Sequence, residues 1–218
     1  MPLTVSDKQA IITDIEETHM TASTTNAILK RIRAKHRGWV FTPRQFAHLG
    51  TRAAVDQALF RLQRTGQIRR LARGVYEFPK VHPKIGVLSP SPEAVAKAMA
   101  ERTGSRISVS GAKAANLLGL STQVPMQNVF WTEGPSRTIR IGNQTVALKH
   151  VAPSKMIGAG TEAGVVIQAV RALGKEGVHE ISIHSLAKQL PRPVKKAVRR
   201  LVPTAPGWSQ PVLNQLSA

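Results

Sequence analysis

Side chains that can read the edges of DNA bases recur along one side of the segment over residues 51–65. At about 100° per residue, Gln57, Arg61 and Arg64 fall opposite an apolar stripe, together with the small Ala53. Arginine can donate two hydrogen bonds to guanine and glutamine can pair with adenine, each worth roughly 1–3 kcal/mol of discrimination. The spacing therefore predicts a helix that reads the major groove.

The opposite side of this segment is apolar and predicts the face that packs into a core, with Val55, Ala58, Leu59 and Leu62. Two further residues lie outside the apolar stripe and are neither base-reading nor basic. Asp56 is placed to orient Arg52 at the N-terminal edge of the helix. Phe60 falls on the outer half, where we expect it to pack against the hairpin that follows.

The flanking residues predict a helix-turn-helix. Thr51 is a helix cap and Gly66 ends the helix. Before it, Thr42 followed by Pro43 predicts a second helix through Leu49 that is closed by Gly50. A first helix with a basic face precedes that one and is broken at Gly38. Two helices joined by a short glycine-containing turn are typical of this motif.

A hairpin is predicted directly after these helices. Ile68–Leu71 and Val75–Phe78 indicate two strands, and Ala72, Arg73 and Gly74 form the turn between them because glycine tolerates positive φ. A hairpin in this place, with an arginine at its tip, is a wing. We expect Arg73 to lie along the DNA backbone or in a narrow minor groove.

We therefore predict a DNA-contacting surface built from threonine, glutamine and arginine side chains, namely Thr42, Arg44, Gln45, Thr51, Arg52, Gln57, Arg61, Arg64, Arg69, Arg70 and Arg73. The partner that we expect for this surface is double-stranded DNA.

The runs Ala58–Leu62, Gly66–Ile68 and Arg70–Tyr76 resemble the winged-helix module of AbiEi-type antitoxins, with a departure at Phe60. The resemblance covers residues 42–78. It implies a bacterial transcriptional regulator of a type IV toxin–antitoxin operon, which acts as antitoxin and autorepressor. It also implies binding as a homodimer to inverted repeats in its own promoter, and neutralisation of a nucleotidyltransferase-like toxin.

Charge supports a nucleic-acid partner. The 218 residues include 31 Lys and Arg against 12 Asp and Glu, a net charge of +19. Residues 24–80 alone carry 13 basic and 2 acidic side chains, a net charge of +11. A surplus concentrated in one segment favours a phosphate-facing surface. The alternative is a solvated basic face that serves solubility.

The composition changes along the chain predict an α+β protein in several parts. Residues 1–23 are an acidic arm or helix, and residues 24–80 are the winged helix-turn-helix domain. Residues 81–90 are a linker, because prolines interrupt regular structure around them. Residues 91–218 form a mixed α/β domain with a small antiparallel sheet.

In the C-terminal half we expect a helix from Pro92, a strand over residues 106–110, a short helix over 112–118, and strands over 129–132, 137–141 and 145–149. Helices follow over residues 162–173, 185–190 and 194–201. This order resembles the second domain of AbiEi-like antitoxins, which implies a part in neutralising the toxin. The last helix has a basic face that could contact DNA, RNA, a toxin or anionic lipid, or simply be solvated.

The sequence offers no recognisable catalytic, metal or cofactor site, and we expect no enzyme activity. The chain has no cysteine, which excludes disulfides and thiolate zinc sites. His179 and His184 are five residues apart, whereas helical zinc ligands are four apart, and their segment alternates like a strand. Residues 158–164 imitate a phosphate loop but lack its lysine, which favours a flexible helix entry.

Two further expectations concern location and function class. The acidic N-terminal residues and the absence of long apolar runs predict a cytoplasmic protein, associated with the nucleoid when bound to DNA, with no membrane partner. The alternative function is an RNA-binding or protein-binding winged-helix module without operator specificity, because winged helices also serve those roles.

Overall fold

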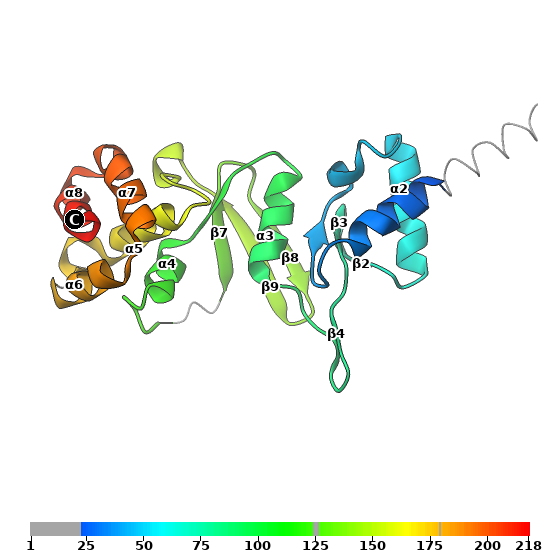
Figure 1. Ribbon diagram of the computed structural model, residues 1–218, viewed down its shortest axis with the longest axis horizontal. Helices are drawn as coiled ribbons and strands as arrows, with labels where there is room; N and C mark the ends of the chain where they lie inside the picture. Colours follow the sequence, from blue (N-terminus) through cyan, green and yellow to red (C-terminus); the bar gives the residue numbers. More distant parts are fainter. Residues whose placement is uncertain (1–22, 124–126, 179) are drawn as a thin grey trace, which may run out of the picture. The chain divides into compact units, whose positions relative to one another are not determined.

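The computed structural model describes residues 23–123, 127–178 and 180–218 (Figure 1). Over these residues the protein combines helices with small sheets, which confirms the predicted α+β class. The chain divides between Arg102 and Thr103 into two compact units. The predicted acidic arm, except residue 23, lies outside the described residues.

The first unit begins, within the described residues, with a helix over residues 23–33. Ile28 and Ile32, one turn apart, are fully buried in its core. The prediction that this helix continues to Gly38 is wrong. The chain reverses at Gly38, where φ is +89°, and Val40–Phe41 forms strand β1. Valine and phenylalanine favour strands, and here a partner strand is available to them.

The second predicted helix is much shorter than expected. It is the 3₁₀ helix η1, Pro43–Phe46, and it does not extend to Leu49 as an α-helix. Pro43 and Phe46 are both buried. Their spacing of three residues matches the three residues per turn of a 3₁₀ helix, so this geometry buries both on one side.

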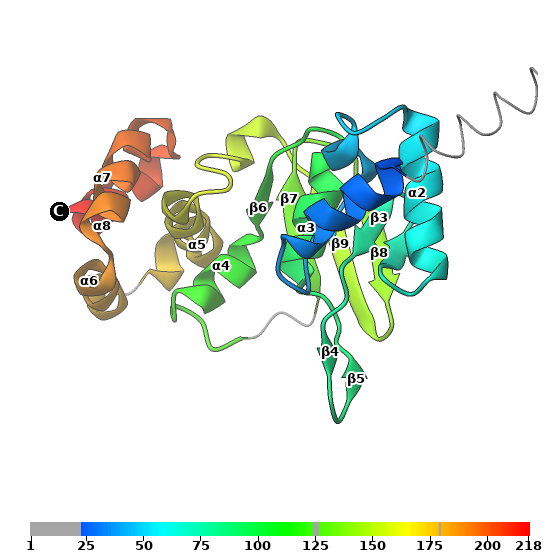
Figure 2. The same cartoon turned by 45° about the vertical axis from the view of Figure 1, so that its right-hand side comes forward.

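Helix α2, Arg52–Arg64, agrees with the prediction at both ends. The Thr51 hydroxyl accepts a hydrogen bond from the backbone N–H of Ala54 at 3.3 Å, which caps the helix. Gly66, with φ of +69°, follows its C-terminal end. The four predicted core residues are buried, and so is Ala54. In Figures 1 and 2 this helix lies beside the blue helix over residues 23–33, whose isoleucines share its core.

The predicted hairpin consists of β2, Arg69–Ala72, and β3, Val75–Glu77. It is not two-stranded, because β1 pairs antiparallel with β3 and the strand order is β1-β3-β2. Phe41 of β1 packs against Phe46 with ring centroids 5.4 Å apart and stacks on Tyr76 at 6.1 Å. These aromatic contacts join the sheet to η1.

Residues 81–90 were predicted to be an interdomain linker, but the division of the chain lies further on, after Arg102. Strands β4, Val81–His82, and β5, Gly86–Val87, form a small hairpin that extends from the first unit (Figure 2). Helix α3, Pro92–Glu101, then packs on β1 and β3. Proline and glycine suit a tight hairpin as well as a linker, so composition alone did not separate the two.

The second unit contains a four-stranded sheet with the order β6-β7-β9-β8. Its strands are β6, Ile107–Val109; β7, Asn128–Thr132; β8, Arg137–Ile141; and β9, Gln144–His150. All four were predicted as strands, but the sheet is mixed, because β7 and β9 are parallel. The four-residue connection after β7 can extend about 13 Å, enough to cross β9 and place β8 on its far side.

Helices complete the second unit. Short α4, Gly111–Leu117, packs on α5, Glu162–Gly177. A core forms among α5, α6 (Glu180–Gln189), α7 (Arg192–Leu201) and α8 (Gln210–Ser217). Short 3₁₀ helices are η2 (Pro153–Lys155), η3 (Val202–Thr204) and η4 (Gly207–Ser209). The prediction omitted α8. Its Leu213 and Leu216 are fully buried, three residues apart.

Two predictions about this unit need correction. The segment from Glu180 is helical rather than a strand, because Ile183 and Leu186, three residues apart, are both buried. The glycine-rich helix entry is closely packed rather than flexible: a Cβ on Gly164 would lie 2.0 Å from the carbonyl oxygen of Gly158. The Thr161 hydroxyl donates to that same oxygen at 2.7 Å. Across the described ranges, no helix is both long and apolar enough to cross a membrane.

Candidate nucleic-acid interface

Five arginines gather around one hollow of about 520 Å³ in the first unit, which we call the arginine pocket. Arg44 comes from η1, Arg52 from the start of α2, and Arg70 and Arg73 from β2 and its turn. Arg102 follows the end of α3. The remaining lining residues are Pro43, Asp56, Gly74 and Tyr76. Five positive charges therefore face one carboxylate among the lining residues, which makes the pocket suited to anions.

The single carboxylate of the pocket is paired as the sequence predicts. Arg52 Nε lies 2.7 Å from Asp56 Oδ2, one helical turn away. Both side chains are largely exposed, at 73% and 48%, so this pair contributes only about 0.3–0.5 kcal/mol to stability. The pair directs Arg52 toward Asp56 at the N-terminal end of α2.

Backbone carbonyls hold two other arginines of the pocket. Arg44 Nη1 donates to the carbonyl oxygens of Glu101 and Arg102 at 3.1 and 3.3 Å, at the C-terminal end of α3. Arg102 Nη1 donates to the carbonyl oxygen of Arg73 at 2.6 Å. A guanidinium group has five N–H donors, so the bonds to Glu101 and Arg102 leave Arg44 with donors for a ligand. The carbonyl oxygens orient Arg44 without neutralising its charge.

Arg102 was not predicted as a site residue. It lies 29 residues after Arg73 and beyond the segment that the sequence assigns to DNA binding. Only the packing of α3 on β1 and β3 brings it to the hairpin turn. No local signal in the sequence could have indicated this.

The outer side of α2 carries a stripe of exposed residues at positions i, i+4, i+7 and i+11, namely Ala53, Gln57, Phe60 and Arg64. We call it the α2 stripe. Phe60 is 56% exposed and does not pack against the hairpin as expected. The Arg64 guanidinium instead lies 6.0 Å from the centre of its ring. An exposed phenylalanine with a cation beside it is thus the centre of this face.

Arg61 was predicted to lie opposite the core but is half-buried. It comes seven residues after Ala54 and therefore lies almost directly along the helix from it. Because Ala54 is buried, the core face is wider on that side than the predicted stripe of four residues. This places Arg61 at the edge of the outer face.

Four other predicted residues do not present free side chains to a ligand. Thr42 is fully buried. Gln45 is half-buried and donates to Glu101 Oε2 at 2.7 Å. Arg69 bonds Glu77, as described below. Thr51 is exposed, but its hydroxyl caps α2. Arg70 and Arg73 are exposed and line the arginine pocket.

The predicted basic helix α7 uses part of its charge internally. Lys195 Nζ donates to the carbonyl oxygen of Ala218 at 2.9 Å, and Arg199 Nη2 donates to that of Ser217 at 2.6 Å. Cations at the C-terminal end of α8 interact favourably with its unpaired carbonyls. Two of the four predicted basic residues therefore secure α8, and Lys196 and Arg200 remain on the exposed side.

Comparison with known proteins assigns the chain to one protein family. A family described as a family of unknown function (DUF6088) matches residues 27–199, most of the chain. The protein belongs to this family. No curated protein matches it. Among solved structures, it is similar to the crystal structure of the RV2827C protein from Mycobacterium tuberculosis. That similarity has 15% sequence identity and a TM-score of 0.39, and covers 90% of this chain and 81% of the other.

In this DUF6088 protein the predicted DNA contact Arg69 has a structural role. Its Nε and Nη2 donate to Glu77 Oε2 at 2.9 and 2.6 Å, and Nη2 also donates to the carbonyl oxygen of Leu88 at 3.1 Å. The Glu77 side chain is only 1% exposed. Burial raises the pKa of the Glu77 carboxyl above its ordinary value, and the hydrogen bond and charge of Arg69 lower it in part.

This raised pKa predicts a pH dependence of stability. The folded protein holds the Glu77 proton more tightly than the unfolded chain does, so the free energy of unfolding falls as pH rises from about 4.3, the ordinary glutamate value, through the raised pKa. Glu77→Gln has no such proton. Urea unfolding should be measured from about pH 3.5, just below the ordinary glutamate value, to about pH 8. The stability of the wild type minus that of Glu77→Gln should be largest at the acid end. A difference that grows with pH would mean that Arg69 outweighs burial.

Proposed function

We propose that the first unit is a winged helix-turn-helix domain that binds duplex DNA, and that the protein is a transcriptional regulator. The observation that carries this proposal is the arginine pocket at the N-terminal end of α2, next to the turn between β2 and β3. Arginine donors around one hollow match the geometry of phosphate oxygens. Phosphate contacts of this kind position a recognition helix on the duplex.

The order of elements supports the same function. The helix over residues 23–33, β1, η1, α2 and the β2–β3 hairpin follow one another in the order of a winged helix, with β1 paired to β3. Helix α2 has 13 residues and is therefore about 20 Å long, enough to lie along the roughly 12 Å wide major groove. The turn at Arg73 would then follow the adjacent backbone.

The chemistry of the α2 stripe suits base edges. Ala53 permits close approach, Gln57 can pair with adenine, and Arg64 can bond guanine. Phe60 is an apolar surface for the methyl group of thymine. None of the four residues is acidic, so the face that would meet the bases adds no repulsion toward phosphate.

We further propose that the bound DNA is the operator of the protein's own operon, and that a homodimer binds the inverted repeats of this operator. We also propose that the protein is an antitoxin against a nucleotidyltransferase-like toxin. This proposal rests on the resemblance of residues 42–78 to AbiEi-type antitoxins. It requires a nucleotidyltransferase-like gene next to this one, whose toxicity co-expression of this protein relieves. Preference for structured RNA over duplex DNA would favour the alternative of an RNA-binding module.

Arg70→Ala tests the arginine pocket. We expect weaker binding of all duplexes, both those selected from a random pool and scrambled ones, because a phosphate contact carries no sequence information. The slope of log affinity against log salt should fall by about 0.9. Fluorescence anisotropy of labelled duplexes measures both quantities.

Arg140→Ala is the matched control for that change. Arg140 is also an exposed strand arginine, and its Nε donates to the carbonyl oxygen of Gly142 at 3.3 Å, as Arg70 Nε does to that of Ala72 at 3.4 Å. It lies in the other unit. The proposal expects Arg140→Ala to bind DNA as the wild type does, and equal losses from the two substitutions would contradict it.

Phe60 predicts sensitivity to single thymine methyl groups. In a duplex selected from a random pool, replacing one particular thymine by deoxyuridine should weaken wild-type binding about three- to tenfold, because a buried methyl group contributes roughly 0.8 kcal/mol or more. Phe60→Ala should lose this sensitivity. Leu117→Ala, a control at a residue 58% exposed in the other unit, should keep it. If Phe60→Ala responds to deoxyuridine as the wild type does, Phe60 does not contact a thymine.

A further inference from the structure

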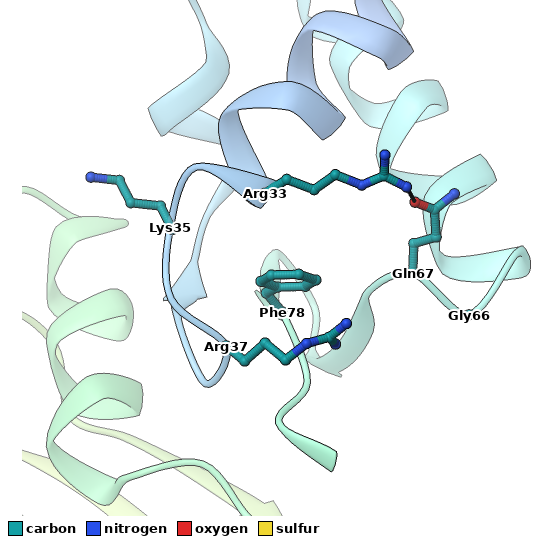
Figure 3. Close-up of a pocket in the computed structure, with 6 residues that line it drawn as sticks. All are labelled: Arg33, Lys35, Arg37, Gly66, Gln67 and Phe78. Atoms are coloured by element: carbon teal, nitrogen blue, oxygen red, sulfur yellow. Dashed lines mark hydrogen bonds between the residues drawn. The ribbon is translucent and has the colours of Figure 1, made fainter.

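A second hollow, of about 560 Å³, lies in the first unit and is distinct from the arginine pocket. It is lined by Arg33, Lys35, Arg37, Gly66, Gln67 and Phe78, and we call it the Phe78 hollow (Figure 3). Gln67 precedes β2 and Phe78 follows β3, whereas the arginine pocket contains the turn between these strands. The two hollows are therefore at opposite ends of one hairpin, about 13 Å apart along a four-residue strand.

The Phe78 hollow has three cations, and its lining includes no carboxylate among the described residues. Arg33 Nη2 donates to the Gln67 side-chain oxygen at 3.2 Å, and Arg37 Nη1 donates to the carbonyl oxygen of Pro79 at 3.1 Å. Both guanidinium groups are held by neutral acceptors, so their positions are fixed while their charge is not compensated. A fixed cation loses less entropy when it binds an anion than a mobile one does.

Phe78 adds an aromatic surface to these cations. The Arg37 guanidinium lies 4.7 Å from the centre of its ring and covers one face. In Figure 3 the ring is seen edge-on, with Arg37 below it and the hydrogen-bonded pair of Arg33 and Gln67 above it. The upper face of the ring thus borders the hollow. A nucleobase can stack on such a face, whatever its sequence.

We propose that the Phe78 hollow binds a nucleoside phosphate, with the base stacked on Phe78 and the phosphate beside Arg33 and Arg37. Lys35 points away from the ring in Figure 3 and adds only its longer-range positive charge. The Gln67 side-chain amide, whose oxygen already accepts from Arg33, has N–H donors left for the base edge. The volume lies within the roughly 300–1,000 Å³ usual for small-molecule sites. The ligand is a free nucleotide or an unpaired nucleotide of a nucleic-acid strand. The site does not depend on the proposed binding of duplex DNA.

The test is calorimetric titration of the full-length protein with AMP, inorganic tripolyphosphate and the single strand dA5. AMP should bind saturably. Phe78→Leu keeps an apolar side chain but removes the stacking surface, and should weaken AMP about five- to tenfold with little effect on tripolyphosphate. Arg33→Ala, at an exposed residue, should weaken both anions. Arg70→Ala should leave AMP binding unchanged, and it should weaken only the tripolyphosphate that the arginine pocket binds.

The two sources of the nucleotide are separated by comparing ligands. If dA5 binds much more tightly than AMP, and Phe78→Leu loses this tight binding, the ligand is a strand of nucleic acid. If AMP binds as tightly as dA5 or more tightly, the ligand is a free nucleotide. Circular dichroism checks that Phe78→Leu folds. If Phe78→Leu does not fold, the comparison of Arg33→Ala with Arg70→Ala decides. The proposal is overturned if neither AMP nor dA5 binds saturably, or if Arg70→Ala weakens AMP binding and Arg33→Ala does not.

Discussion

Glu77 is a buried carboxylate on the central strand of the three-stranded sheet, and Arg69 lies directly opposite it on β2. Removing Arg69 would leave the charge of the buried Glu77 carboxylate without compensation, which is destabilising. The pair therefore fixes the register of the hairpin. A slip of one residue would turn every side chain of β2 to the other face and remove Arg70 from the arginine pocket. The bond from Arg69 to Leu88 ties the β4–β5 hairpin to the same point.

This fixed hairpin organises the basic charge of the first unit. At its turn, Arg70 and Arg73 face α2 and the end of α3 across the arginine pocket. At its other end, Phe78 lies beside Arg33, at the end of the first helix, and Arg37. The net charge of +11 over residues 24–80 is thus not a uniform solvated face. Much of it is collected into two hollows, each with arginines held by neutral groups.

Much of the first unit could be predicted because its signals are local. The Thr51 cap and the glycines at positions 66 and 74 act within a few residues of themselves, and the ends of α2 and the hairpin turn follow from them. The pairing of β1 with β3 and the packing of α3 join residues that are far apart in sequence. Those contacts placed Arg102 in the arginine pocket and moved the unit boundary beyond the predicted linker.

The errors within α2 have a different origin. The prediction took four residues as the core face, and the burial of Ala54 widened that face toward Arg61. Alanine fits both a core and a surface, so periodicity alone did not assign it. Phe60 was expected to find a packing partner, as most phenylalanines do, and its exposure became evident only when the position of the hairpin was known. The parallel pairing of β7 with β9 likewise depends on a crossover that strand periodicity does not encode.

Hydrogen–deuterium exchange of the full-length protein, with and without duplex DNA, reports most directly which surface the DNA covers. If the first unit binds DNA, exchange slows in the first turn of α2 and in the turn between β2 and β3, and stays unchanged in α7. Slower exchange confined to α7, with none in α2 or the hairpin turn, would place DNA binding in the second unit and contradict DNA binding by the first.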